Sequence, residues 1–148
     1  MRFGFKRQKN EQELLILFVC VENSGSSQIA EGFFNKYAPK GYRAVSAGTR
    51  PTSQINPLAV QAMKEVGIDI SNQKPKIIDD DMIRDSAKAI NMGCMDQWEC
   101  PMLFMGNVIE WGIEDPKGKP IEKVRQIRDD IEKRVREIAE TLEKSNNS

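Results

Sequence analysis

Histidine is absent from the 148-residue sequence, and this absence removes whole classes of active site. Without an imidazole there is no Cys-His or Ser-His-Asp activation of a nucleophile, and most zinc sites lose a usual ligand. The sequence also has no surplus of charge of either sign, because 22 Lys and Arg residues balance 22 Asp and Glu residues. Proteins that bind nucleic acid usually carry a basic surplus, so we expect no nucleic-acid partner.

Long hydrophobic runs and cysteines are scarce as well. The longest strongly apolar run, at 14–19, is far shorter than the ~20 residues of a membrane span, and no signal peptide with a small-residue cleavage site precedes it. Three cysteines are an odd number, which suits thiol chemistry in a reducing compartment better than structural disulfides. We therefore expect a cytoplasmic protein without a membrane partner, a metal or a cofactor.

What is present is typical of one folded domain. Hydrophobic residues make up 39% of the sequence and charged residues 30%, which is ordinary globular usage. A chain of this length can bury roughly two-thirds of its unfolded surface, so it needs no disulfide or metal to fold. Residues 1–13 show no sustained hydrophobic period and are predicted to be an N-terminal extension, whereas 14–145 are predicted to form the domain.

The hydrophobic pattern predicts strands and helices that alternate along the chain. The run at 14–20 is continuously apolar, as expected for a strand buried on both faces of a parallel sheet. Further strands are predicted at 42–47, 87–92 and 108–113, and helices at 28–38, 56–67, 78–84 and 121–142. Such alternation is typical of an α/β fold, here a single domain with a central four-stranded parallel sheet flanked by helices.

The segment CVENSGSS, at 20–27, joins the first strand to the first helix. Ligands of parallel sheets bind at the carboxyl ends of strands, and Cys20 lies at such an end. Backbone N–H groups at the start of the helix suit a tetrahedral oxyanion, and their field is expected to lower the pKa of Cys20. From spacing alone, a buried cysteine followed by a serine-capped polar turn is an equal alternative. The predicted oxyanion-binding residues are Val21, Glu22, Asn23, Ser24, Gly25, Ser26 and Ser27.

Longer motifs give the chain a family resemblance. LFVCVENSGSSQIAEG at 17–32 is followed in order by VSAGT at 45–49, AMKEVGIDIS at 62–71 and EDP at 114–116. This series resembles the low-molecular-weight tyrosine phosphatase superfamily and, within it, the thioredoxin-coupled arsenate reductases. Two details favour the reductases over the phosphatases. Cys94 and Cys100 lie where the reductases keep a redox pair, and Lys117-Gly118 follows Asp115-Pro116 where phosphatases usually carry two aromatic residues.

The resemblance implies a mechanism and its partners. Cys20 would attack arsenate while Asp115 protonates the departing oxygen. Cys94 would then attack the Cys20 adduct and release arsenite, Cys100 would resolve the disulfide, and thioredoxin would reduce the final Cys94–Cys100 pair. The alternatives for the two cysteines are unrelated buried thiols or a structural disulfide. Without the resemblance, Asp115-Pro116 would be read as turn chemistry alone.

One departure from the family pattern concerns the oxyanion loop itself. The family loop is Cys, five residues and Arg, but Ser26 stands at the position of that arginine. A serine hydroxyl cannot replace a charged, bidentate oxyanion donor, so we expect impaired arsenate reduction. Gly25 is expected to loosen the loop further.

A base from another loop could partly substitute for the arginine, and Arg50, Lys117 and Lys119 are the candidates by position. Two other functions stay open. One is a low-molecular-weight tyrosine phosphatase, which would need Cys20 and Asp115 but neither Cys94 nor Cys100. The other is a catalytically silent homologue that binds oxyanions or serves redox regulation.

Overall fold

Residues 13–93 and 98–146 of the computed structural model are described, and they alternate strands and helices in the predicted order. None of the helices in these ranges combines the length and apolarity that crossing a bilayer demands. The predicted N-terminal extension lies outside the described residues up to position 12.

The strands are β1 (Leu14–Cys20), β2 (Tyr42–Gly48), β3 (Ser86–Asn91) and β4 (Val108–Glu110). The helices are α2 (Ser26–Tyr37), α3 (Pro57–Lys64), α4 (Asp80–Asp85), α5 (Pro101–Phe104) and α6 (Ile121–Asn146).

The four strands form one parallel sheet in the order β2-β1-β3-β4, which confirms the predicted fold class. From β1 the chain crosses to β2 on one side, and later returns to β3 on the other side of β1. The strand order therefore reverses beside β1. In open α/β sheets this reversal opens a crevice at the carboxyl ends of the strands, and Cys20 ends β1 at that point.

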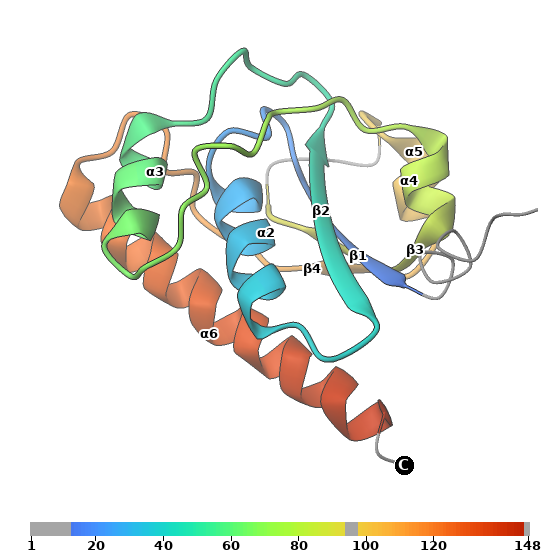
Figure 1. Cartoon of the computed structure of the whole chain (residues 1–148). Coiled ribbons are helices and arrows are strands. Elements are labelled where there is room, and N and C mark those ends of the chain that lie inside the picture. Colours follow the sequence, from blue (N-terminus) through green and yellow to red (C-terminus); the bar gives the residue numbers. More distant parts are fainter. Residues whose placement is uncertain (1–12, 94–97, 147–148) are drawn as a thin grey trace, which may run out of the picture.

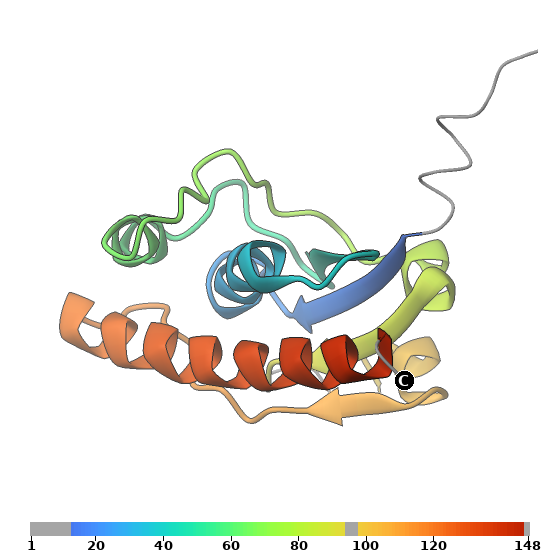
Figure 2. The same ribbon diagram turned by 60° about the horizontal axis from the view of Figure 1, so that its bottom comes forward.

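Helices cover both faces of the sheet (Figures 1 and 2). On one face Ile16 and Phe18 of β1 pack in a large core with α2, α3 and the long α6. On the other face Leu17 and Val19 pack in a smaller core toward α4 and α5. Because successive strand residues point to opposite faces, Cys20 belongs to the first core. All of β1 from Ile16 to Val19 is therefore fully buried, as its continuous apolar run predicts.

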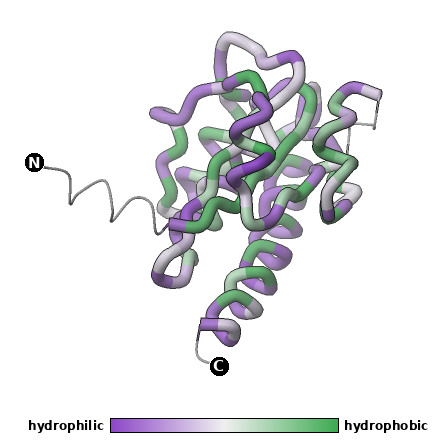
Figure 3. Tube along the Cα trace, turned by 90° about the vertical axis from the view of Figure 1, so that its right-hand side faces the viewer, coloured by the Kyte–Doolittle hydropathy of each residue, from purple (hydrophilic) through white to green (hydrophobic). Residues whose placement is uncertain are grey.

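Local sequence signals explain the helix boundaries. The Asn56 side chain accepts a hydrogen bond from the Leu58 N–H at 2.9 Å, and Pro57 fills the first helical position of α3. Gly67 takes a φ of 82° after that helix, the left-handed conformation that favours glycine. Along α6, hydrophobic and hydrophilic residues alternate turn by turn, so one side is buried and the other exposed (Figure 3).

Some boundaries differ from the predictions. Helix α2 begins at Ser26, two residues before the predicted start, so the loop is shorter than expected. Strand β4 ends at Glu110, three residues before the predicted end at 113. Helix α6 continues to Asn146, four residues beyond the predicted end at 142. The short helix α5, with Pro101 in its first turn, was not predicted.

Trp111, directly after β4, is buried in the large core. Its ring centroid lies 5.7 Å from that of Phe18, and the Trp111 side chain is 7% exposed. Trp98, in contrast, is 82% exposed. The core therefore continues under the loop that leads from β4 to Asp115.

Candidate active site

Loops from the carboxyl ends of two strands enclose a cavity of about 220 Å³. One is the loop after β1, and the other follows β4 and contains Asp115. Cys20 and Asp115, far apart in the sequence, thus face the same space. The lining residues are Cys20, Val21, Glu22, Ser24, Gly25, Ser26, Asp115 and Lys117.

The backbone of the β1–α2 loop is held from outside the cavity. Three of its carbonyls accept N–H groups from the segment 50–56: Val21 from Arg50 at 2.8 Å, Glu22 from Thr52 at 3.1 Å and Ser24 from Asn56 at 2.8 Å. For the N–H groups of Ser24, Gly25 and Ser26, the described residues provide no hydrogen-bond acceptor. Helix α2 likewise has no side-chain cap and no acidic residue in its first turn. Unpaired amides at the positive end of a helix form an anion site.

The sulfur of Cys20 is buried and hydrogen-bonded. Its Sγ lies 2.9 Å from Ser27 Oγ, and the backbone N–H of Asn23 donates to it at 3.2 Å. The residue is 7% exposed. Cys20 is therefore positioned by one residue of the β1–α2 loop and one residue of the first turn of α2, while it still lines the cavity.

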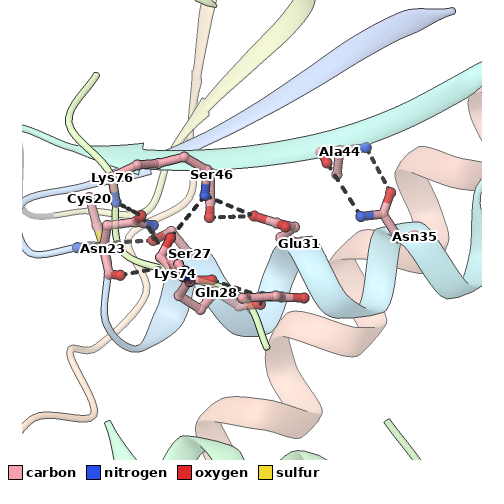
Figure 4. A network of polar contacts seen from close by, with 11 residues as sticks. Cys20, Asn23, Ser27, Gln28, Glu31, Asn35, Ala44, Ser46, Lys74 and Lys76 are labelled. Atoms are coloured by element: carbon pink, nitrogen blue, oxygen red, sulfur yellow. Dashed lines mark hydrogen bonds and ion pairs between the residues drawn. The ribbon is translucent and has the colours of Figure 1, made fainter. Parts of the chain in front are cut away.

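A polar network behind the cavity fixes the direction of these hydrogen bonds (Figure 4). The Lys76 backbone N–H, which can only donate, points at Asn23 Oδ1 at 2.9 Å. The Asn23 Nδ2 group therefore faces Ser27 Oγ, to which it donates at 2.8 Å. Because Ser27 Oγ accepts this bond, its own proton is available for the Cys20 sulfur. The network thus orients the Ser27 hydroxyl to stabilise a thiolate.

Asn23 has a backbone conformation that suits this role. Its φ is 51°, the only positive φ of a non-glycine residue among those described. Asparagine tolerates the left-handed region better than most residues. Asn23 is fully buried, and the Gln28 side chain donates to both its backbone oxygen and its Oδ1, at 2.9 and 3.1 Å. Asn23 and Ser27, both predicted to bind the oxyanion, thus position Cys20. Asn23 does so through its backbone N–H, and its side chain orients the Ser27 hydroxyl.

The prediction that the loop lowers the pKa of Cys20 is wrong. Burial raises the pKa of this thiol above its ordinary value, and the hydrogen bonds from Ser27 and Asn23 only partly oppose the effect. The negative charge of Asp115 raises the pKa further. The positive end of α2 favours the thiolate of Cys20, but this effect is smaller than the cost of burying a charged sulfur. The β1–α2 loop contains no cationic side chain that would add to it.

The Ser27 hydroxyl can be tested through the pH dependence of Cys20. We expect Ser27→Ala to raise the pKa of Cys20 further, because it removes a donor to the thiolate. It also leaves the buried Asn23 amide without its acceptor, which should lower the free energy of unfolding by about 1–3 kcal/mol. The measurement is the pH profile of Cys20 alkylation in a background without Cys94 and Cys100.

Ser53→Ala is the matched control, because Ser53 is exposed in the neighbouring loop. A Ser27→Ala profile that coincides with the unsubstituted one, or moves to lower pH, would contradict the proposed direction of the hydrogen bond.

Gly25 and Pro116 hold the two cavity loops together. A Cβ atom at Gly25 would lie 2.6 Å from Pro116 Cγ, so only glycine allows this close approach. Pro116 is buried, and the Asp115 carboxylate beside it accepts the Lys117 backbone N–H at 3.0 Å. The missing side chain at Gly25, expected to loosen the loop, instead lets the loop that carries Asp115 pack against it.

Comparison with known proteins places this arrangement in a family. The family profile described as low molecular weight phosphotyrosine protein phosphatase matches residues 15–148. The match includes both cavity loops and all four strands but for the first residue of β1. The chain belongs to the low-molecular-weight phosphotyrosine protein phosphatase family.

Individual members of this family are similar over most of the chain. Arsenate reductase 1 of Staphylococcus haemolyticus is 40% identical over 129 residues, which cover 86% of this chain and 96% of that protein. A solved arsenate reductase in a phosphate-binding state has a TM-score of 0.78 at 31% identity and covers 86% of this chain and 98% of the other. A thioredoxin-dependent arsenate reductase of Corynebacterium glutamicum has a TM-score of 0.77 at 34% identity. This match covers 95% of this chain and 67% of the other.

Ser26, which the sequence resemblance predicts to stand at the position of the family arginine, is the first residue of α2 and lines the cavity. The three bases suggested as substitutes lie differently. Arg50 pairs with Glu99 at 3.7 Å and Lys119 with Glu114 at 3.6 Å, and neither lines the cavity. Only Lys117 of the three is part of the cavity wall.

The predicted redox pair is described only in part. Cys94 lies outside the described residues. Cys100 is a free, buried thiol directly before α5, and it packs with the smaller core. Its neighbour Glu99 accepts a hydrogen bond from Thr49 at 3.4 Å, which ties this segment to the loop after β2 at the same edge of the sheet.

The residues that sequence reasoning missed are those of the supporting network. Lys76 contributes a backbone N–H, and Gln73 donates to Gln28 at 2.8 Å from 45 positions away. A glutamine side chain and a backbone N–H group belong to no sequence motif. No local signal in the sequence could therefore have identified these residues. No cluster of metal-binding side chains occurs within the described ranges.

Proposed function

We propose that this protein is an arsenate reductase that works by a thiol-disulfide relay coupled to thioredoxin. The observation that carries the proposal is the single cavity in which Cys20, free loop amides and Asp115 meet at the carboxyl edge of the sheet. A tetrahedral oxyanion suits such amides, and a thiol and a carboxyl group on one cavity suit nucleophilic attack with acid catalysis. The substrate is supported by relatives named arsenate reductases that align over most of the chain.

In the first half of the reaction, the Cys20 thiolate forms a bond to the arsenic of bound arsenate. One arsenic–oxygen bond breaks, and Asp115 supplies the proton with which this oxygen leaves as water. The amides of the β1–α2 loop hold the remaining oxygens. Ser27 keeps a hydrogen bond on the sulfur while it is charged. The product is an enzyme-bound cysteine–arsenic(V) adduct.

In the second half, the Cys94 thiolate attacks the Cys20 sulfur. The electron pair of the sulfur–arsenic bond passes to arsenic, so arsenite leaves and a Cys20–Cys94 disulfide forms. Cys100 then attacks Cys94, which frees Cys20 and leaves a Cys94–Cys100 disulfide. Thioredoxin supplies the two electrons that reduce this disulfide. Because the relay begins from three reduced thiols, we place the protein in the cytoplasm.

We further propose that Ser26 slows this enzyme. The raised pKa of Cys20 means that only a small fraction of the sulfur is thiolate at neutral pH. An arginine at position 26 would favour the thiolate and bind two oxygens of the substrate. The serine hydroxyl is uncharged and short, so it stabilises the thiolate less and binds the substrate oxygens less strongly.

A second candidate function is hydrolysis of phosphate monoesters, as the family description suggests. The same cavity favours it, because Cys20 and Asp115 suffice for that reaction without Cys94 or Cys100. The third candidate function is that of a silent homologue that binds oxyanions without turnover. The absence of an arginine from the segment 20–27 favours it.

Arsenate-dependent oxidation of NADPH in the presence of thioredoxin and thioredoxin reductase tests the proposal. We expect oxidation that requires both arsenate and thioredoxin, with arsenite formed in equal amount. Hydrolysis of p-nitrophenyl phosphate is measured in parallel. Hydrolysis without arsenate turnover would establish the phosphatase function, and the absence of both activities would establish the silent homologue.

A further inference from the structure

The cavity of the candidate active site has a deficit of positive charge. Its charged lining residues are two carboxylates, Glu22 and Asp115, and one ammonium group, Lys117. A doubly charged tetrahedral oxyanion that enters this space meets repulsion from both carboxylates. Free amides compensate in part, but a fully charged donor binds an oxyanion more strongly. Any cation in the cavity wall therefore has a large influence on binding.

Lys117 is held at the cavity by both its main chain and its side chain. Its backbone N–H donates to the Asp115 carboxylate at 3.0 Å, and its Nζ lies 2.8 Å from Glu22 Oε2. The pairing with Glu22 raises the pKa of Lys117, so the ammonium form persists over the whole physiological range. The amide of Lys117 thus contacts a carboxylate of its own loop, and its ammonium group contacts a carboxylate of the β1–α2 loop.

The contact between Lys117 and Glu22 is easily exchanged. The Lys117 side chain is 66% exposed and that of Glu22 is 30% exposed, and exposed ion pairs of this kind contribute little to stability. The long, flexible lysine stem allows its ammonium group to keep its place while it changes partners. An oxyanion in the cavity offers several acceptor oxygens in place of one carboxylate oxygen.

We propose that Lys117 supplies the positive charge that the loop lacks at Ser26, and that Glu22 competes with the oxyanion for this ammonium group. The inference rests on the oxyanion site of the proposed function and deepens it. Glu22 then acts as an internal competitor that weakens binding of singly and doubly charged oxyanions. Lys117 has a second effect through its amide, which holds Asp115 in the cavity whatever side chain stands at this position.

Binding of inorganic phosphate, measured by isothermal titration calorimetry, tests this inference without any turnover. Lys117→Met keeps the amide and removes the ammonium group, so we expect phosphate affinity to fall about tenfold or more, as for loss of a charged hydrogen-bond donor. Glu22→Gln should raise affinity severalfold. Lys119→Met is the matched control, because it removes the same charge two residues away, where the ammonium pairs with Glu114 outside the cavity.

A further background sharpens the test. With arginine introduced at position 26, the effect of Lys117→Met should shrink, because the guanidinium takes over the charge. Equal affinities of the Lys117→Met and Lys119→Met variants, or no phosphate binding by the unsubstituted protein, would overturn the inference. Lys117-dependent phosphate binding without arsenate turnover would support the inference and refute the proposed reductase function. Arsenate turnover whose KM is unchanged by Lys117→Met would support the proposed reductase function and refute the inference on Lys117.

Discussion

Ser26→Arg is expected to raise kcat/KM for arsenate by about 10²–10³, the range found for a single preorganised oxyanion donor. Ser26 is the first residue of α2 and lines the cavity with Cys20, so a longer side chain can extend into this space. A guanidinium group there would bind two oxygens of the substrate at once. It would also stabilise the developing charge where the loop now offers only amides and hydroxyls.

The same substitution should change the titration of the nucleophile. Burial raises the pKa of Cys20, and a positive charge beside the sulfur favours its charged form, so the pKa should fall. The pH profile of Cys20 alkylation should move to lower pH in parallel with the gain in turnover. A larger thiolate fraction at neutral pH contributes to the increase in kcat/KM.

Two variants at the same position separate charge from length. Ser26→Lys adds charge without the bidentate fork, and Ser26→Gln adds length without charge, so we expect an intermediate gain for the first and little gain for the second. If Ser26→Arg folds and binds phosphate but turns arsenate over no faster than the unsubstituted protein, the absent arginine is not what limits this enzyme.

Replacing the cysteines one at a time should give three different outcomes. Cys20→Ser is expected to abolish both arsenate reduction and phosphate-ester hydrolysis, because it removes the nucleophile. Cys94→Ser should abolish arsenate turnover and leave ester hydrolysis intact. Cys100→Ser should allow a single turnover and then accumulate a Cys20–Cys94 disulfide, which mass spectrometry of the alkylated protein detects.

The matched control addresses packing at Cys100, which is 9% exposed and contacts the smaller core. Cys100→Ala retains an apolar side chain, so agreement between the alanine and serine variants attributes the loss to the thiol itself. Full arsenate turnover by Cys94→Ser would refute the relay, and a requirement for Cys20 alone would favour the phosphatase.

The features that sequence predicted well are those with a local cause. The apolar run at 14–19 identifies a central strand, because β1 has a strand on either edge and helices on both faces. Asn56 and Pro57 start α3 through a hydrogen bond that spans only two residues. The position of Cys20 at the carboxyl end of β1 follows from the same local pattern.

Features that depend on distant contacts could not be predicted. The orientation of Ser27 depends on Asn23, whose own orientation is set by the Lys76 amide 53 positions away. The Glu22–Lys117 pair joins residues 95 positions apart. The pKa of Cys20 was predicted in the wrong direction because the helix start is visible in the sequence, whereas the burial of the sulfur is a result of tertiary packing.

The two tryptophans lie in opposite environments, and this difference should be visible in their fluorescence. The Trp111 ring is tilted against that of Phe18 inside the core, and Trp111 leads into the loop that carries Asp115. Trp98, two residues before Cys100, is largely exposed. Their emission spectra should therefore be separable, with blue-shifted light from the buried indole and red-shifted light from the solvated one. Single-tryptophan versions of the protein would then report ligand entry and thiol exchange as independent fluorescence signals, without an attached dye.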